Sequence, residues 1–418
     1  MQATPRQAAG SRDLTPFDLN LRHLRGLLAV QDHGSISAAC SEVGLSQPAL
    51  TQGILKLEQQ LGQPLFDRRP DGMVPTVAGE QLIQRVRACL DHLAHGVKFM
   101  AVNGFEPDRR MSMTQIRALL AVVKAGSLAQ AALDLDLSQP AVHRAVRELE
   151  STLGRRLVER RGRGVQVNFL GKRFARACRL AVKELQAAFT ELGLDAHDPV
   201  IAVGTTPLVR AFLVPEGIAT MLSEHAHASF RVLEGSWSEL VEHLRDGLID
   251  LVVGEIPDTQ VPGLATVPLY GQAPVIVSGH QHPLARAPAV PVRELRHYPW
   301  IIAPEGSPLR TQWETLFRPT LPATPVECGS IMILGRLLTS SESLSLAMPD
   351  QIALQIRSGL LARIAANVHF EPCTIGVTLL EGWKPTAAQS RFIETLRTVS
   401  HAALAESPRP ARIESAWV

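Results

Sequence analysis

The chain has 418 residues, of which 45% are apolar and 20% charged. At about 100–200 residues per domain this is enough for two to four domains with hydrophobic cores, and it excludes disordered, collagen-like and coiled-coil classes. The net charge of +2 conceals an asymmetry, because residues 1–197 carry 26 basic and 19 acidic side chains (+7) and residues 198–418 carry 16 and 21 (−5). A basic half joined to an acidic one indicates a polyanion, nucleic acid first, as a partner.

The N-terminus lacks the apolar core of a signal peptide, and the longest uncharged stretch, 259–280, is interrupted by three prolines and three glycines. We therefore expect a cytoplasmic protein. The five cysteines lie tens of residues apart without a C-x-x-C pair, which predicts neither a disulfide framework nor a zinc site. A thiol redox sensor remains the minor alternative to inert buried cysteines.

The N-terminal half contains an internal repeat. Shifted by 92 positions, the segment from Leu21 to Glu80 overlies the segment from Met113 to Lys172 without a gap, with 22 identities over 60 positions. This similarity indicates a duplicated domain rather than a shared composition.

Each copy is predicted to fold as three short helices and a basic turn. A glycine ends the first and third helices, and a serine caps the second and third, with proline in the first turn of the third. These positions are Gly34, Ser35, Ser46 and Gly62 in copy one and Gly126, Ser127, Ser138 and Gly154 in copy two. Gly53, inside the third helix of copy one, is expected to cost that helix about 1 kcal/mol relative to alanine. The order is typical of a winged helix-turn-helix, whose third helix enters the DNA major groove.

With these residues in place, the chain resembles the LysR-type transcriptional regulators. The similarity rests on the L-S-Q-P-A and L-E-x-x-L-G segments of both copies, on F-D-R-R and V-E-R-R before the turns, and on T-x-A-G at 76–79. The family normally carries one such domain, so the duplication is a departure.

The resemblance implies that a glutamine, a proline, a small polar residue and an arginine of the third helix approach DNA, and that a basic wing residue enters the minor groove. The DNA-binding candidates in copy one are Gln47, Pro48, Thr51, Gln52, Arg68 and Arg69. Those in copy two are Gln139, Pro140, His143, Arg144, Arg160, Arg161 and Arg163. Either glutamine could instead cap its own helix.

The two copies are not expected to bind DNA equally. Copy two has Arg144 where copy one has Gln52, and residues 139–179 hold 11 basic and 3 acidic side chains (+8), against 5 and 4 (+1) in residues 47–87. Because phosphate neutralisation supplies much of the affinity for DNA, copy two should dominate binding. The alternative, a solvated basic face without a partner, is disfavoured because the charges lie on a groove-facing helix and a wing.

A longer amphipathic helix follows each wing, with apolar residues every three or four positions. In LysR-type regulators such linker helices pair antiparallel between chains, which implies a homo-oligomer, a dimer or tetramer, formed through linker helices and effector domains. Here one chain has two of them, so they could pack on each other within the chain. The alternatives are that each packs on its own winged domain, or that both pair between chains.

From residue 199 the pattern changes to short β-rich runs that alternate with helical stretches. The runs are 200–204, 229–235, 250–254, 274–279, 299–304 and 374–380. This alternation predicts a mainly parallel sheet with helices on both faces and a functional site at the carboxyl ends of the strands. The half resembles the family's effector-binding domain, an α/β fold of two lobes like the periplasmic binding proteins. The similarity runs through the segments 204–215, 246–254, 280–284 and 345–349.

Hydroxyl side chains follow several of these strands, where they and the backbone N–H groups of helix starts suit a carboxylate or phosphate. For any one of them, capping a helix is the simpler role. The effector-binding candidates are Thr205, Thr206, Ser236, Trp237, Ser307, Arg310 and Ser330. The resemblance places Thr206 and the three serines in the cleft between the lobes. Arg310 would pair with a carboxylate, and Trp237 would stack on the ligand or, equally, pack in the core.

These features predict a DNA-binding transcription regulator that senses a small anionic effector, without enzymatic activity, cofactor or metal, since no catalytic or nucleotide-binding fingerprint occurs. The alternative is a cytoplasmic solute-binding protein of the periplasmic-binding-protein fold, which the basic N-terminal half opposes.

The predicted domains are a flexible arm (1–18), winged domain one (19–79) with linker helix (80–103), winged domain two (111–171) with linker helix (172–194), an effector domain (198–405; lobe I 198–272 and 368–405, lobe II 273–367) and a tail (406–418).

Overall fold

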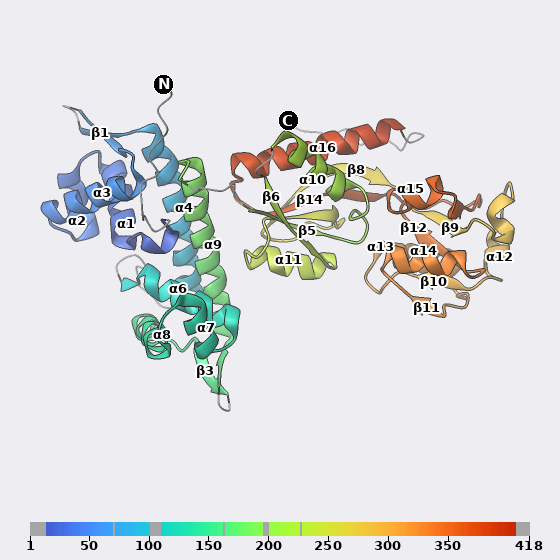
Figure 1. The fold of residues 1–418 in the computed structure, drawn as a ribbon, viewed down its shortest axis with the longest axis horizontal. Helices are drawn as coiled ribbons and strands as arrows, with labels where there is room; N and C mark the ends of the chain where they lie inside the picture. Colours follow the sequence, from blue (N-terminus) through green and yellow to red (C-terminus); the bar gives the residue numbers. More distant parts are fainter. Residues whose placement is uncertain are drawn as a thin grey trace, which may run out of the picture. The chain divides into compact units, whose positions relative to one another are not determined.

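A computed structural model of the chain describes residues 14–69, 72–100, 110–161, 164–194, 200–225 and 228–406, without the side chains of residues 160, 161, 164 and 402–406. The chain divides into two compact units, residues 1–197 and 198–418 (Figure 1). Most of the expected arm (1–13), the last residues of the first linker helix (101–103), Arg163 and the tail from residue 407 lie outside the described residues.

The first unit contains two winged helix-turn-helix domains. Domain one consists of α1 (Leu21–His33), α2 (Ile36–Val43), α3 (Gln47–Leu61) and the hairpin of β1 (Phe66–Arg69) and β2 (Gly72–Pro75). Domain two consists of α6 (Met113–Ala125), α7 (Leu128–Leu135), α8 (Gln139–Leu153) and the hairpin of β3 (Val158–Arg161) and β4 (Gly164–Val167). The expected serine caps are confirmed at both copies of the second and third helices, and the expected glycine ends, all in the left-handed conformation, at both copies of the first and third. The second helix of domain two ends instead at Asp136, which adopts the left-handed conformation without being a glycine.

The cores of the two winged domains differ by a matched exchange. In domain one Gly26 packs against Leu50 so closely that a Cβ at Gly26 would lie 2.5 Å from Leu50 Cδ1. The repeat offset puts Ala118 and Val142 at these positions in domain two, and both are buried. One carbon has in effect moved from α3 to α1, so both cores stay filled with different pairs of side chains.

Gly53 has a similar packing role. A Cβ at Gly53 would lie 2.9 Å from Cδ2 of His23, whereas the repeat puts Ala145 and Gln115 at these two positions in domain two. The glycine that was expected only to weaken α3 therefore also makes room for the half-buried His23 ring.

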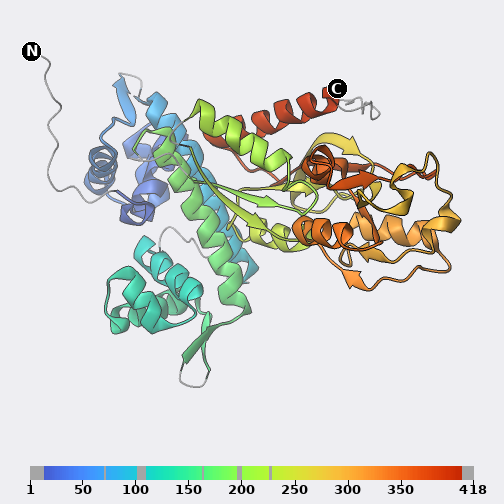
Figure 2. The ribbon, with the colours of Figure 1, turned by 45° about the vertical axis from the view of Figure 1, so that its right-hand side comes forward.

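The linker helices α4 (Val77–Phe99) and α9 (Phe169–Glu191) lie side by side and antiparallel in the first unit (Figures 1 and 2). Arg85, in the first half of α4, contacts Glu191 at the end of α9. At the other end, the ring centroids of Phe99 and Phe169 are 6.1 Å apart. Of the three arrangements that the sequence left open, the structure therefore has the two linker helices paired within one chain.

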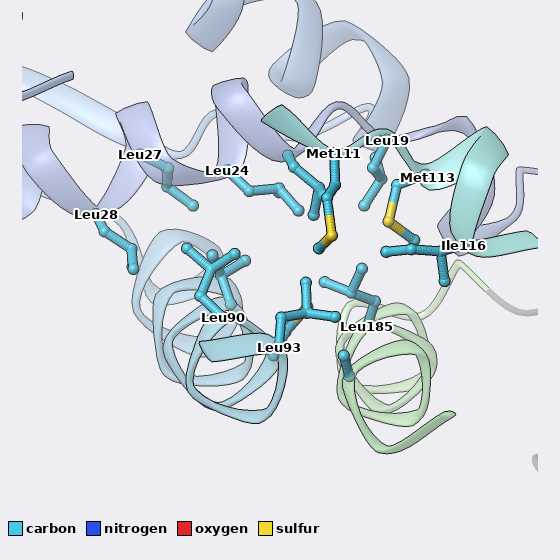
Figure 3. Close-up of a cluster of buried hydrophobic side chains, with 14 of the residues drawn as sticks. Leu19, Leu24, Leu27, Leu28, Leu90, Leu93, Met111, Met113, Ile116 and Leu185 are labelled. Atoms are coloured by element: carbon cyan, nitrogen blue, oxygen red, sulfur yellow. The ribbon is translucent and has the colours of Figure 1, made fainter. Parts of the chain in front are cut away.

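The linker pair shares a hydrophobic core with both winged domains (Figure 3). Leu93 of α4 and Leu185 of α9 lie among side chains from both copies, including Leu24 and Ile116. The winged domains therefore pack around a common centre.

Residues 14–18, which the sequence assigned to a flexible arm, belong to this packed region. They include the short 3-10 helix η1 (Pro16–Asp18), which contacts α6 and α9. Pro16 is buried, and the Arg117 guanidinium lies 5.8 Å from the centroid of the Phe17 ring. The apolar side chains of this segment explain the correction, because burial on domain two stabilises an ordered conformation.

The second unit contains two five-stranded sheets. The first has the order β6–β5–β7–β14–β8, with β5 (Val200–Thr205), β6 (Ser229–Glu234), β7 (Leu251–Glu255), β8 (Leu264–Gln272) and β14 (Cys373–Leu380), and with α10 (Leu213–Glu224), α11 (Trp237–Arg245) and α16 (Ala387–Glu406). The second has the order β11–β10–β12–β9–β13, with β9 (Val275–Gly279), β10 (Trp300–Ile302), β11 (Val326–Glu327), β12 (Leu344–Ala347) and β13 (Leu361–Arg363). Its helices are η2 (Pro283–Arg286), α12 (Val292–Leu295), α13 (Pro308–Phe317), α14 (Ile331–Thr339) and α15 (Pro349–Arg357).

Both sheets are mixed, so the expectation of a mainly parallel sheet is wrong. Three strands of each sheet pair in parallel, and the other two pairings are antiparallel. The chain leaves the first sheet along β8, enters the second at β9 and returns from β13 to β14. β8 was missed because Pro268 and Gly271 interrupt its apolar residues, which is typical of a loop.

Candidate DNA interface and effector site

The third helix of each winged domain exposes the residues that were predicted to read DNA. On α8, Gln139, Pro140, His143 and Arg144 are exposed, and on α3, Gln47, Pro48 and Gln52 are exposed, with Thr51 half-buried. The Thr51 hydroxyl donates to the Gln47 carbonyl (2.9 Å), and His143 Nε2 accepts from Arg147 Nε (3.3 Å). Each helix therefore carries a continuous outward-facing group of candidates at its N-terminal end.

The serines, not the glutamines, cap these helices. Ser46 Oγ accepts from the N–H of Ala49 (3.4 Å), and Ser138 Oγ accepts from the N–H of Ala141 (3.3 Å). Each glutamine is the first residue of its helix. The capping alternative for Gln47 and Gln139 is thus wrong, since the cap position holds a serine in both domains.

A glutamate, buried in domain two and half-buried in domain one, positions each wing, a role that the sequence motif alone did not reveal. In domain two, Glu150 Oε1 accepts from the N–H groups of Leu157 (2.8 Å) and Val158 (3.0 Å). In domain one, Glu58 Oε1 accepts from the N–H of Leu65 (2.8 Å). The glutamate of L-E-x-x-L-G therefore ties the third helix to the start of the wing through charge-assisted hydrogen bonds.

The glycine that closes each motif has a steric reason. A Cβ at Gly79 would lie 2.0 Å from the Leu65 carbonyl oxygen, and one at Gly171 would lie 2.2 Å from that of Leu157. Only glycine allows the linker helix to start this close to the turn before the wing.

The wing candidates differ in what the structure describes. Arg68 and Arg69 lie on β1 with exposed side chains. Arg160 and Arg161 lie on β3, but the structure does not describe their side chains. Arg163 lies outside the described residues.

Domain one pairs some of its basic side chains with its own acids, as domain two does through Glu150. Glu42 lies 2.6 Å from Arg25 and 2.8 Å from His33, and Asp32 lies 2.8 Å from Arg87. At the position of Asp32, domain two has the exposed Lys124. The exchange of Asp32 for Lys124 adds to the charge difference between the two domains.

In the second unit, two hydrogen bonds join the loops at the carboxyl ends of the two sheets. Arg210, in the loop after β5, donates to the Gly329 carbonyl beside Ser330 (2.7 Å) and to Glu234 at the end of β6 (2.8 Å). Gln351, at the start of α15, donates to the Pro207 carbonyl (2.7 Å). The loops that carry Thr206 and Ser330 therefore meet between the lobes, and the sequence reasoning had not singled out Arg210.

Both threonines are buried and already hydrogen-bonded. Thr206 Oγ1 donates to Glu255 Oε2 (2.6 Å), and Thr205 Oγ1 lies 3.4 Å from the Thr206 carbonyl. Glu255 ends β7, next to β5 in the sheet. The hydroxyl of Thr206, which was expected to bind an anionic ligand, therefore already donates its hydrogen bond to the carboxylate of Glu255.

The three serines precede helices as expected but differ in their bonds. Ser236 forms a capping box with Glu239, whose pKa is lowered by the hydrogen bonds from Ser236. Ser307 and Ser330 precede α13 and α14 without a side-chain capping bond. Their hydroxyls are therefore better candidates for a ligand than that of Ser236.

The remaining two candidates are engaged elsewhere. Arg310 lies 2.6 Å from Glu314 and 3.2 Å from Glu327, and these hydrogen bonds, that of Glu314 first, raise its pKa. Trp237 packs against the core under α11, and its buried indole N–H finds no hydrogen-bond acceptor among the described residues. Arg310 already has carboxylate partners on its own lobe, and the packing of Trp237 favours its core role.

Three of the cysteines are protected from ionisation. Burial raises the pKa of the Cys89 and Cys178 thiols, which lie in the linker pair. Burial, with the nearby Glu255, also raises the pKa of Cys373 to about 11. Such thiols are poor nucleophiles at neutral pH, which disfavours a redox role for them.

Among the described residues, no group of three or more histidine, cysteine or acidic side chains is placed to hold a metal ion. His282 instead caps η2, accepting at Nδ1 from the N–H of Leu284 (3.0 Å). No helix in the described part of the chain combines the length and apolar character needed to cross a membrane.

Three regions of the chain match known protein families. Residues 195–400 match the LysR substrate binding domain, and residues 21–80 and 113–172 each match the bacterial regulatory helix-turn-helix protein of the lysR family. The second match at 113–172 agrees with the duplicated winged domain seen in the fold.

Individual relatives give the same result. The chain is 26% identical over 386 residues to the HTH-type transcriptional regulator GalR of Pseudomonas putida, covering 91% of this chain and 97% of that protein. It is 27% identical over 296 residues to the HTH-type transcriptional regulator PcaQ of Agrobacterium fabrum, covering 69% and 95%. A full-length OxyR variant from Pseudomonas aeruginosa shares the fold with a TM-score of 0.56 at 18% identity, covering 69% of this chain and 98% of that one. The chain belongs to the LysR family of DNA-binding transcriptional regulators, with a C-terminal domain that senses an effector.

Proposed function

We propose that the second winged domain supplies most of the DNA affinity of this regulator and that the first makes a weaker, second contact. The observation that carries the proposal is the charge difference between equivalent exposed surfaces. α8 presents Arg144 where α3 presents Gln52, and domain two has Lys124 where domain one has Asp32. Each phosphate contact that is lost lowers the salt dependence of binding by a measurable amount.

The test compares single arginine variants of the full chain on a mixed-sequence duplex over a range of salt concentrations. Arg144→Ala should weaken binding and reduce the slope of log affinity against log salt by about 1. Arg68→Ala, on the wing of domain one, should change both quantities less, and Gln52→Ala serves as an uncharged control. A larger loss for Arg68→Ala than for Arg144→Ala would overturn the proposal.

The effector is a small anion that binds where the loops of the two sheets meet, with Arg210 in place of Arg310 as its cationic partner. Glu234, the present partner of Arg210, has a side chain that is 59% exposed, so an incoming carboxylate can replace it at little cost. Ser330 follows Gly329, whose carbonyl accepts from Arg210, and Ser307 precedes α13 in the same lobe. Thr206, four residues before Arg210, donates its hydroxyl to Glu255. The role is binding and signal transmission in the cytoplasm, without catalysis or a cofactor.

A thermal-shift screen of small carboxylates against their matching amides tests this site. A binding carboxylate should stabilise the wild type, stabilise Glu234→Gln more strongly, and lose its effect in Arg210→Met. Thr206→Val reports whether the hydroxyl beside Glu255 takes part. Stabilisation by the amides alone would contradict the anionic class, and unchanged stabilisation of Arg210→Met would contradict the site.

The lobes transmit binding only to the extent that the effector prefers one arrangement of them. Arg210 and Gln351 bridge the loops of the two sheets directly. Oligomers of this chain form through the effector domains, because the linker helices already pair within the chain.

A further inference from the structure

The contact between α4 and α9 contains a buried group of three charged side chains. Arg85 Nε lies 3.1 Å from both carboxylate oxygens of Glu191, and Arg85 Nη1 lies 3.0 Å from Glu184 Oε2. The exposed fractions of these side chains are 5% for Arg85, 9% for Glu184 and 23% for Glu191. Burial acts to lower the pKa of Arg85, but the hydrogen bonds to Glu191 and Glu184 raise it above its ordinary value.

The internal repeat shows that this group is not symmetric. The offset of 92 residues gives α9 an alanine, Ala177, at the position of Arg85, and gives α4 His92 and Phe99 at the positions of Glu184 and Glu191. His92 faces its own counterpart, since its Nε2 lies 4.0 Å from Glu184 Oε1. Equivalent positions of the two helices therefore meet near the middle of the pair. The charged group lies between the first half of α4 and the last half of α9, and the opposite half of the pair has no equivalent group.

This asymmetry decides which helices can pair. Two copies of α4 packed in the same way would bury Arg85 of each opposite His92 and Phe99 of the other, without a carboxylate at either position. Two copies of α9 would place Glu184 against Glu184 and Glu191 against Ala177. A buried charge without an oppositely charged partner is strongly unfavourable. Pairing of α4 with a second α4, or of α9 with a second α9, is therefore disfavoured.

Where the second half of α4 packs against the first half of α9, steric contacts also disfavour the pairing of two copies of α9. A Cβ at Gly96 of α4 would lie 2.5 Å from the Cβ of Ala177 on α9, well inside normal contact. The counterpart of Gly96 on α9 is Ala188, which has that Cβ. Two copies of α9 would therefore clash at this point, independently of their charges.

We propose that Arg85, Glu184 and Glu191 make the linker helices selective, so that α4 accepts α9 and neither helix accepts a second copy of itself. The partner of α4 is the α9 of its own chain, because residues 100–168, which form domain two, tether α9 to α4 and keep its effective concentration high. The helix face that LysR-type regulators use between chains is thereby occupied within this one. Each chain carries a complete and fixed pair of DNA-binding domains.

Charge variants of the full chain test this selectivity. Arg85→Glu sets three carboxylates together, and Glu184→Arg with Glu191→Arg sets three guanidinium groups together. Each change alone should lower the hydrogen-exchange protection of α4 and α9 by about a hundredfold or more. Arg87→Glu, an exposed arginine on the same helix, is the matched control and should change this protection by less than about tenfold.

Two recombinations show whether the charges choose the partner. All three changes in one chain should restore the protection of α4 and α9. Mixing the two charge variants should restore the protection of α4 and α9 that each variant lacks alone, because α4 of one chain can then pair with α9 of the other. The proposal is overturned if Arg85→Glu behaves like Arg87→Glu, or if neither the combined chain nor the mixture regains protection.

Discussion

The exchange of Gly26 and Leu50 for Ala118 and Val142 predicts a strongly coupled pair of mutations in domain one. Gly26→Ala gains about 1 kcal/mol of helix stability, but its Cβ at 2.5 Å from Leu50 Cδ1 overpacks the core at a cost of about 1–3 kcal/mol. Leu50→Val alone removes one methylene from a fully buried side chain and should cost about 0.5–1.5 kcal/mol. The double variant should be at least as stable as the wild type, because valine vacates the space that the new methyl group needs.

Hydrogen exchange in the full chain is the suitable assay, because a chain of several domains does not unfold in one two-state step. Protection of α1 and α3 reports domain one, and α6 and α8 serve as an internal reference that none of the variants should change. If the losses of the single variants simply add in the double variant, the packing explanation is refuted.

Two further predictions use the repeat as its own control. Glu150→Gln should lower the hydrogen-exchange protection of its wing more than Glu58→Gln does, because Glu150 accepts from two backbone N–H groups and Glu58 from one. The expected loss is about 1 kcal/mol for each of these charge-assisted hydrogen bonds. Equal losses in the two variants would contradict this prediction. Burial, and to a lesser extent the charge of Lys56, lower the pKa of His23 below its ordinary value of 6.5. As the pH falls below that value, His23 takes up a proton more readily in the unfolded chain than in the folded one, so domain one loses stability. His23→Gln should remove this part of the acid sensitivity, measured as protection of α1 and α3 between about pH 7.5 and 5.5, and an unchanged pH dependence would count against it.

Much of the first unit could be predicted because its signals are local. Ser46-Gln-Pro and Gly62 define α3 within a few residues, and the same residues 92 positions later define α8. The exchange of Gly26 and Leu50 was also visible in the repeat as two opposite changes of size. What the repeat could not show is that these two positions touch.

The effector site was less predictable because its bonds join distant parts of the chain. Thr206 was identified, but its partner Glu255 lies 49 residues away on a neighbouring strand. Arg310 was chosen for its charge, and only the fold shows that Glu314 and Glu327 already engage it. Arg210, which spans the lobes, looked like an ordinary residue of a family motif.

The linker helices show both sides of this limit. Their apolar spacing predicted two amphipathic helices, the resemblance to LysR-type regulators implied that such helices pair, and the duplication raised the possibility of a pair within one chain. The selective charges could not be recognised, because Arg85 and Glu184 are 99 residues apart and each looks like an ordinary surface residue in the sequence.

Selection of duplexes from a random pool tests the central claim most directly, namely that this chain reads DNA and does so mainly through its second winged domain. The full chain should enrich a defined base sequence, Arg144→Ala should lose the preference within the part that α8 reads, and Gln52→Ala should keep it. No enrichment by the full chain, or the same enriched sequence from Arg144→Ala, would contradict the account.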